Sequence, residues 1–184
     1  MKHKRIGLIV SAGVFLSVLT VLALAAQDKY ALKVQGGLSF SEFRGYEAWQ
    51  VVSISQDGPL MAATLANPVM IKAYLAGFPG NGRPFPDGAK MAKIHWIPKK
   101  METFPAATVP GTQHDVDFMV KDSKRFADSG GWGYAVFEYD AASDTFTPGT
   151  MADKPPQGND AKCGYACHTK VMTRDYVFTE YGHR

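Results

Sequence analysis

The sequence has little net charge once its N-terminus is set aside. The chain has 184 residues, with 20 lysines and arginines against 17 aspartates and glutamates. Three of the basic residues lie within residues 1–25, so the remaining 17 basic and 17 acidic side chains balance. A neutral domain lacks the basic surface that attracts nucleic acid or anionic lipid. We therefore expect no nucleic acid as a partner.

Internal repeats and low-complexity tracts are also missing, and cysteine is scarce. Residues 26–184 are enough for one domain that buries most of the surface of its unfolded chain. The chain has two cysteines, Cys163 and Cys167. Any chemistry that needs a pair of thiols therefore falls on these two positions.

The first 25 residues have the composition of an export signal. A basic start, Met1 to Arg5, precedes an apolar run from Ile6 to Leu22, and the small residues at 23 and 25 match a cleavage pattern. We predict a signal peptide over 1–25, a single domain over 26–184 and a periplasmic location. The apolar run approaches the length that spans a bilayer, so an uncleaved membrane anchor is the alternative.

Both cysteines lie in the sequence CGYACH at 163–168, one residue longer than the Cys-x-x-Cys-His signature of c-type cytochromes. Two thiols can add to the vinyl groups of haem while the adjacent imidazole binds the iron. The extra residue turns Cys163 by about 100° more around a helix. Gly164 can absorb this turn, because glycine adopts backbone angles closed to other residues. We predict one haem c per chain, attached through Cys163 and Cys167, with His168 bound to iron.

Two other uses of the same residues stay open. Cysteines four apart in an exported protein can form a disulfide, although so short a loop stabilises little and needs no adjacent histidine. Zinc would need His168 and a distant fourth ligand. The remaining histidines show no metal-binding spacing: His3, His95, His114 and His183.

Alternating apolar and polar residues dominate the rest of the chain. This period predicts five strands, at 49–55, 61–66, 90–97, 115–120 and 132–139. Helical signals are short: Asn67-Pro68 predicts a cap leading into 69–75, and 123–127 predicts another turn. Strands without long crossover helices favour antiparallel pairing. We predict a mainly β (α+β) fold, a twisted antiparallel sheet with a few short helices and a C-terminal haem-binding segment.

The predicted strand over 90–97 carries a lysine on a partly apolar face. Alternation places Lys93 on the same face as Met91 and His95. The simplest interpretation is an edge-strand lysine that guards against aggregation. Burial, however, favours the neutral form of a lysine, and a neutral amine is a nucleophile and a base.

Several short stretches between about Trp49 and Tyr181 keep a common order and spacing. They are Asn67-Pro68 with Tyr74, Asp87-Gly88-Ala89 with Lys93, residues 120–127, residues 132–137, the Cys/Cys/His motif, and residues 175–179. Together they resemble the cytochrome P-460 family, bacterial c-type cytochromes whose haem is also cross-linked to a lysine. The resemblance implies a mostly β fold with five-coordinate haem and a homodimer.

The resemblance also implies roles for individual residues. Cys163 and Cys167 match the thioether cysteines, and His168 matches the proximal iron ligand. Lys93 matches the lysine whose nitrogen bonds the porphyrin edge, which makes it the candidate catalytic residue. The chain departs from the family at the distal arginine, where it has Ala62. Met61 and His95 are candidate replacements.

The sequence and the resemblance lead to three alternative functions. In the family, hydroxylamine is oxidised at an open haem iron, so the resemblance implies an oxidoreductase acting on hydroxylamine or nitric oxide. Its electrons would pass to a soluble periplasmic cytochrome. A non-catalytic relative, similar to the β-sheet cytochromes c-prime, would bind nitric oxide or carbon monoxide beneath an apolar cap such as Phe85 or Phe118. The third function is an electron carrier with methionine as the sixth iron ligand.

Overall fold

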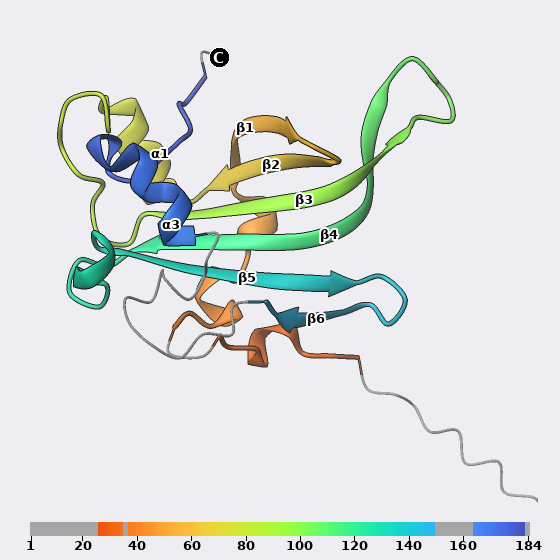
Figure 1. Ribbon diagram of the computed structural model, residues 1–184, viewed down its shortest axis with the longest axis horizontal. Coiled ribbons are helices and arrows are strands. Elements are labelled where there is room, and N and C mark those ends of the chain that lie inside the picture. The colour runs from red at the N-terminus through yellow and green to blue at the C-terminus, as the bar shows by residue number, and fades with distance from the viewer. Residues whose placement is uncertain (1–25, 35–36, 150–163, 183–184) are drawn as a thin grey trace, which may run out of the picture.

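Figure 1 shows the computed structural model, which describes residues 26–34, 37–149 and 164–182. The predicted signal peptide, the alternative anchor and Cys163 lie outside these residues. Within the described ranges, no helix combines the length and apolarity needed to cross a bilayer.

Six strands form one antiparallel sheet in the part of the chain that the structure describes. They are β1 (Gln50–Asp57), β2 (Leu60–Ala66), β3 (Lys90–Lys100), β4 (Thr108–Lys121), β5 (Trp132–Asp140) and β6 (Thr145–Pro148). The strands pair in chain order. The predicted antiparallel sheet is confirmed, and all five predicted strands are present. The short β6 is absent from the prediction, because its four residues are too few to establish a period.

The helices are short, as predicted. They are α1 (Pro68–Leu75), α3 (Gly164–His168) and the 3₁₀ helices Lys29–Ala31, Phe40–Phe43, Tyr46–Ala48, Ala127–Ser129 and Thr169–Arg174. The predicted cap of α1 is confirmed, since the Asn67 side chain accepts a hydrogen bond from the amide of Met70. The turn predicted over 123–127 becomes helical only at its last residue.

The N-terminal part of the domain seals one face of the sheet. Aromatic rings from its 3₁₀ helices pack on inward side chains of β3, β4 and β5. Phe43 stacks on Phe118 of β4 with ring centroids 4.1 Å apart. Phe40 contacts Phe118 and Phe137, and each such aromatic pair adds roughly 0.5–1.5 kcal/mol beyond the burial of its area. Among the described residues, this cluster fills the centre of that face with packed aromatic and aliphatic side chains.

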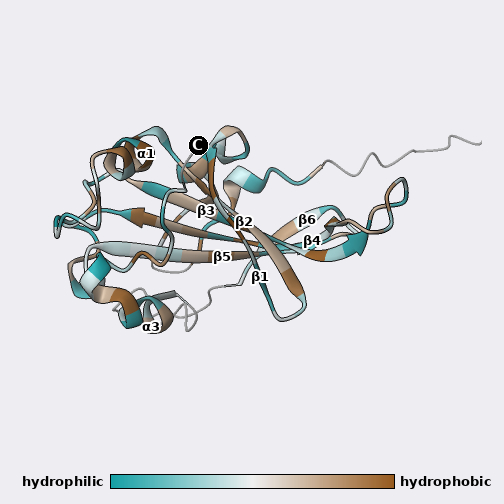
Figure 2. Ribbon diagram, turned by 90° about the horizontal axis from the view of Figure 1, so that it is seen from above, coloured by the Kyte–Doolittle hydropathy of each residue, from teal (hydrophilic) through white to brown (hydrophobic). Residues whose placement is uncertain are grey.

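The opposite face is covered at one end only. There α1 and the C-terminal segment pack on the sheet through Met70, Tyr74 and Val177, which contact a cluster that includes Met91 and Met119. Helix α3 lies beside β5, and Figure 2 shows α1 and α3 at the same end of the sheet. The remainder of the face is the floor of the cavity described below.

The predicted alternation of β3 is confirmed up to His95. Ala92 belongs to the sealed core, while Met91 belongs to the cluster under α1, so the two point to opposite faces. Lys93 shares the face of Met91. A bulge between His95 and Trp96 interrupts the alternation beyond this point.

Asn67 joins helix α1 to the sheet. Its Oδ1 accepts hydrogen bonds from the amides of Met70 and Lys90, each at 3.0 Å, and its Nδ2 donates to the carbonyl of Gly88 at 2.8 Å. The side chain is 9% exposed. The buried side-chain amide of Asn67 therefore serves three backbone groups: one in α1, one in β3 and one in the turn before β3.

We expect Asn67→Ala to lower the free energy of unfolding by about 2–4 kcal/mol, because a cap and two further backbone partners are lost at a buried position. The control is Asn81→Ala, which removes two hydrogen bonds at an exposed site and should cost less than about 1 kcal/mol. Urea denaturation followed by circular dichroism measures both. Equal losses would show that Asn67 has no special role.

Candidate functional site

A cavity of about 600 Å³ lies between the open face of the sheet and α3. The sheet contributes Lys93 of β3, and the C-terminal segment contributes Gly164, Cys167 and His168. Small-molecule and cofactor sites have volumes of roughly 300–1,000 Å³. Three of the four predicted site residues therefore line one cavity of suitable size. The fourth, Cys163, lies outside the described residues.

Lys93 is brought to the cavity by strand register. It is half-buried on β3 between Thr64 of β2 and Asp117 of β4, both directly opposite it in the sheet. All three side chains line the cavity. Because β3 is a central strand, Lys93 does not guard a sheet edge, and that simpler interpretation is wrong.

The orientation of His168 is set by a hydrogen bond from its Nδ1 to the carbonyl oxygen of Tyr176, at 2.5 Å. A nitrogen that donates to a carbonyl carries the proton, so Nε2 keeps its lone pair. Burial lowers the pKa of His168, as does the charge of Lys93, although the hydrogen bond to Tyr176 opposes them. The imidazole is therefore neutral near pH 7, which is the form that binds a metal.

The acceptor carbonyl depends on an unusual backbone. Asp175 and Tyr176 have φ values of 50° and 64°, in the left-handed region that non-glycine residues seldom occupy. The Tyr176 ring lies against Gly130, where a Cβ atom would stand 2.2 Å from it. Such a conformation persists only where surrounding contacts hold it.

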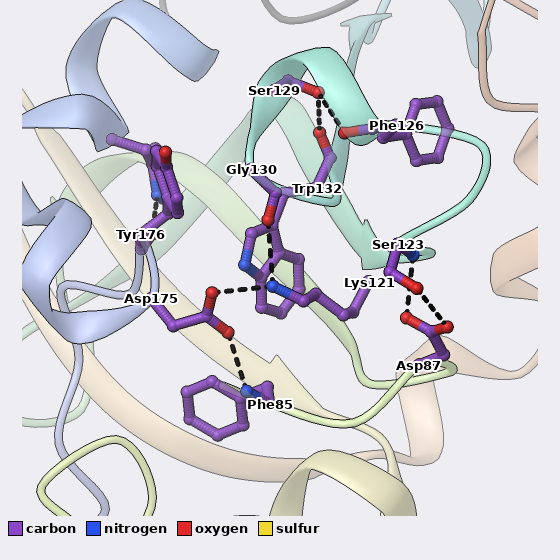
Figure 3. Close-up of polar contacts among 11 residues, drawn as sticks. Phe85, Asp87, Lys121, Ser123, Phe126, Ser129, Gly130, Trp132, Asp175 and Tyr176 are labelled. Atoms are coloured by element: carbon purple, nitrogen blue, oxygen red, sulfur yellow. Dashed lines mark hydrogen bonds and ion pairs between the residues drawn. The ribbon is translucent and has the colours of Figure 1, made fainter. Parts of the chain in front are cut away.

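A buried ion pair supplies those contacts, as Figure 3 shows. The ammonium of Lys121 donates to Asp175 Oδ1 at 2.6 Å and to the carbonyl of Gly130 at 3.0 Å. The other Asp175 oxygen accepts from the amide of Phe85 at 2.7 Å. The Lys121 and Asp175 side chains are 5% and 12% exposed. The pair ties the chain that presents the Tyr176 carbonyl to β4.

Helix α3 is seated directly on the sheet. A Cβ atom at Gly164 would lie 2.7 Å from Cβ of Tyr134 on β5, a distance that real contacts do not reach. Glycine at this position therefore lets α3 approach β5 closely. The His168 ring in turn packs at 5.1 Å from the ring of Tyr134 and at 5.0 Å from that of Phe178. The sequence predicts a role for the conformational freedom of Gly164. The structure adds a second role, because the missing side chain lets α3 approach β5.

The sheet side of the cavity carries several polar side chains among apolar ones. Its lining includes the hydroxyls of Ser53, Ser55 and Thr64 and the carboxylate of Asp117. Burial raises the pKa of Asp117 to about 6, helped by the negative charge of Asp115. Period-two patterning marks Asp117 only as a polar strand residue, so sequence reasoning missed it.

The candidates for the family's arginine position are placed on different faces. Ala62 pairs with His95, so the imidazole lies beside a small side chain, whereas Met61 pairs with Trp96. His95 is hydrogen-bonded to Asp115. Neither Met61 nor His95 is among the side chains that line the cavity in the described residues.

The two candidate cap residues of the gas-binding alternative are core residues. Phe85 and Phe118 are each 2% exposed. Phe118 belongs to the cluster on the sealed face, and Phe85 packs against Tyr74 and Trp132 under α1. Phe118 is among the residues that line the cavity, but its ring is held in the core by stacking on Phe43.

Comparison with known proteins gives one result. A family model described as cytochrome P-460 matches residues 43–179, which is most of the chain. The match includes the whole sheet and α1. It also includes Cys167 and His168, the cysteine and histidine of the motif that the structure describes. No curated protein matches the chain.

The residues that line the cavity fit a haem. A thiol and a neutral imidazole from one helix face the same space, and the imidazole has its free nitrogen available for a metal. A half-buried amine approaches from the opposite wall. These donors suit a covalently attached haem better than a zinc ion, because the fourth zinc ligand is not provided by any histidine in the described cavity lining.

We expect Lys121→Met to lower the free energy of unfolding by about 3–5 kcal/mol, because it leaves the buried Asp175 carboxylate without its cation. The control is Glu180→Gln, which breaks the exposed pair between Arg174 and Glu180 and should cost less than about 1 kcal/mol. Both are measured by urea denaturation. A loss for Lys121→Met as small as that of the control would contradict the anchoring role.

Proposed function

The chain belongs to the cytochrome P-460 family, so its cofactor is a haem with iron, and we propose that it is a periplasmic c-type oxidoreductase that oxidises hydroxylamine. In this proposal Cys163 and Cys167 carry the haem as thioethers, and His168 binds the iron. The amine of Lys93 bonds the porphyrin edge. The homodimer and the soluble cytochrome that accepts electrons remain predictions.

One observation carries the proposal: Lys93, Cys167 and His168 line the same cavity although a lysine on β3 and a helix near the C-terminus are far apart in sequence. Attachment at opposite walls would hold the macrocycle rigidly and restrict its distortion, which is one way in which a protein controls haem chemistry. Chance would seldom place an amine, a thiol and an oriented imidazole around one space of cofactor size.

When bound, the haem supplies the redox centre and an open coordination position for a small nitrogen compound. Oxidation of two hydroxylamines to one nitrous oxide and one water releases four protons and four electrons. The electrons leave to an external acceptor, and the protons need a route out of the cavity. Polar side chains on the sheet side support this requirement, since Ser53, Ser55, Thr64 and Asp117 line it.

The chain's own residues orient the reacting parts. His168 keeps one tautomer because its Nδ1 proton is donated to the Tyr176 carbonyl. The ion pair of Lys121 and Asp175 holds that carbonyl in place. The hydroxyl groups of Ser53, Ser55 and Thr64 and the carboxylate of Asp117 in the cavity lining favour hydroxylamine oxidation, which needs groups that accept protons, over gas binding, which needs none.

Catalysis is tested by expressing the full chain in a host competent for cytochrome c maturation. We expect steady-state oxidation of hydroxylamine with an artificial electron acceptor, at a rate above that of an equal concentration of free haem. Nitrous oxide should account for the nitrogen consumed. A coloured, haem-loaded protein without turnover above the blank would leave a cytochrome but defeat the enzyme.

The role of Lys93 is tested by the visible spectrum. We expect a red-shifted ferrous Soret band in the native protein and its return to the ordinary c-type position in Lys93→Ala, because the nitrogen substituent on the porphyrin is lost. The control is Lys99→Ala, an exposed lysine on the same strand. An identical spectrum in all three proteins would rule out the cross-link and favour the gas-binding alternative.

A further inference from the structure

Four side chains, His95, His114, Asp115 and Asp117, converge at one place on the open face of the sheet, and the function above uses only Asp117. His95 of β3 lies directly opposite Asp115 of β4, and Lys93 lies opposite Asp117. Because side chains two apart on a strand share a face, Asp115 and Asp117 point to the same side as His95. The bulge beyond His95 inserts His114 as an extra residue of β4, which brings its imidazole to Asp115.

The potential ligand atoms of His95, Asp115 and Asp117 all lie within 4.8 Å of one another. Nδ1 of His95 is hydrogen-bonded to Asp115 Oδ1 and stands 3.9 Å from Asp117 Oδ2. Ligands at the usual distances from a tetrahedral zinc ion are roughly 3.4 Å apart. Small side-chain movements would therefore complete a three-ligand coordination sphere.

The charge of this cluster also favours a cation. Within the described residues, the ion-pair partners of Asp115 and Asp117 are imidazoles, from His95 and His114. The two ionised carboxylates carry a charge of −2, which one divalent ion would neutralise. The Asp115 and His95 side chains are each 13% exposed and that of Asp117 is 40% exposed, so solvent screens the charge of Asp115 weakly and that of Asp117 more strongly.

The directions of the donor atoms distinguish a metal site from a proton relay. A relay through an imidazole uses one ring nitrogen on each side, to pass the proton across the ring. His95 instead presents the same nitrogen, Nδ1, to both carboxylates. Donor atoms that converge on one point are the arrangement that a metal ion requires.

We propose that Asp115, Asp117 and His95 Nδ1 bind a divalent first-row transition-metal ion, with zinc as the reference ion, and that the metal displaces the proton through which Nδ1 is hydrogen-bonded to Asp115. An imidazole in the ligand set selects against calcium and magnesium, which prefer oxygen donors. His114 contacts Asp115 Oδ2 at 2.7 Å and holds the carboxylate from behind, as outer-sphere partners of metal ligands do. Three protein ligands leave a coordination position open.

The site adjoins the haem cavity without being part of its described lining, except through Asp117. A metal bound there would fix the Asp117 carboxylate and place a positive charge beside it, in addition to that of Lys93, which lies opposite Asp117 in the sheet. Metal binding at this place does not depend on which substrate the haem oxidises. It requires only that the four side chains keep the arrangement described.

The test is zinc binding to the purified, haem-loaded full chain. The protein is stripped with a chelator and dialysed against Zn²⁺, and zinc and iron per chain are counted by mass spectrometry. We expect one more zinc per chain in the native protein than in His95→Ala or in the isosteric Asp115→Asn, with affinity weakened more than about 100-fold in both variants. The control is Asp140→Asn, an exposed carboxylate outside the cluster, which should bind as the native protein does.

His114→Ala separates a ligand from its support: it should keep the stoichiometry but weaken zinc binding about 10–100-fold. An unchanged Soret band in each variant shows that the fold and the haem are intact. Native protein that takes up no more zinc than Asp115→Asn would overturn the site. Zinc binding without hydroxylamine turnover would defeat the proposed function alone, and turnover without zinc binding would defeat the metal site alone.

Discussion

The hydrogen bond from His168 to the Tyr176 carbonyl is the constraint on which the arrangement of the site depends. It fixes which ring nitrogen carries the proton and therefore which nitrogen can bind a metal. The carbonyl is presented by a left-handed backbone, which the buried pair of Lys121 and Asp175 holds to β4. Gly130 leaves the space that the Tyr176 ring occupies. The direction of one imidazole thus depends on three distant segments of the chain.

The two faces of the sheet have different roles: one is packed and stabilises the fold, and the other carries the candidate site. Its sealed face carries packed aromatic rings, among them Phe43 and Phe118, which stack on each other. Its open face is covered by α1 and the C-terminal segment at one end, and beyond that cover it carries charged side chains such as Lys93 and Asp117. Polar residues on the middle strands of a sheet break the usual patterning, and such exceptions concentrate at functional sites.

The haem cavity and the proposed metal site meet at Asp117. This carboxylate lines the cavity beside Lys93 and also approaches His95. Burial and the charge of Asp115 raise its pKa to about 6, so it lies in an environment where its negative charge is poorly compensated. Either a proton or a bound cation would neutralise that charge. Both events would change the electrostatic potential within the cavity.

The sequence by itself determined the features that depend on neighbouring residues. Alternation was sufficient for the five longer strands and for the face of Lys93, and Asn67-Pro68 was sufficient for the start of α1. The adjacency of Cys167 and His168 pointed to haem for the same local reason. Tertiary structure decided the long-range contacts of the site: the hydrogen bond from His168 to the Tyr176 carbonyl, the ion pair of Lys121 with Asp175, and the contact of His95 with Asp115. These depend on strand register, a bulge and long-range packing, for which no local period exists.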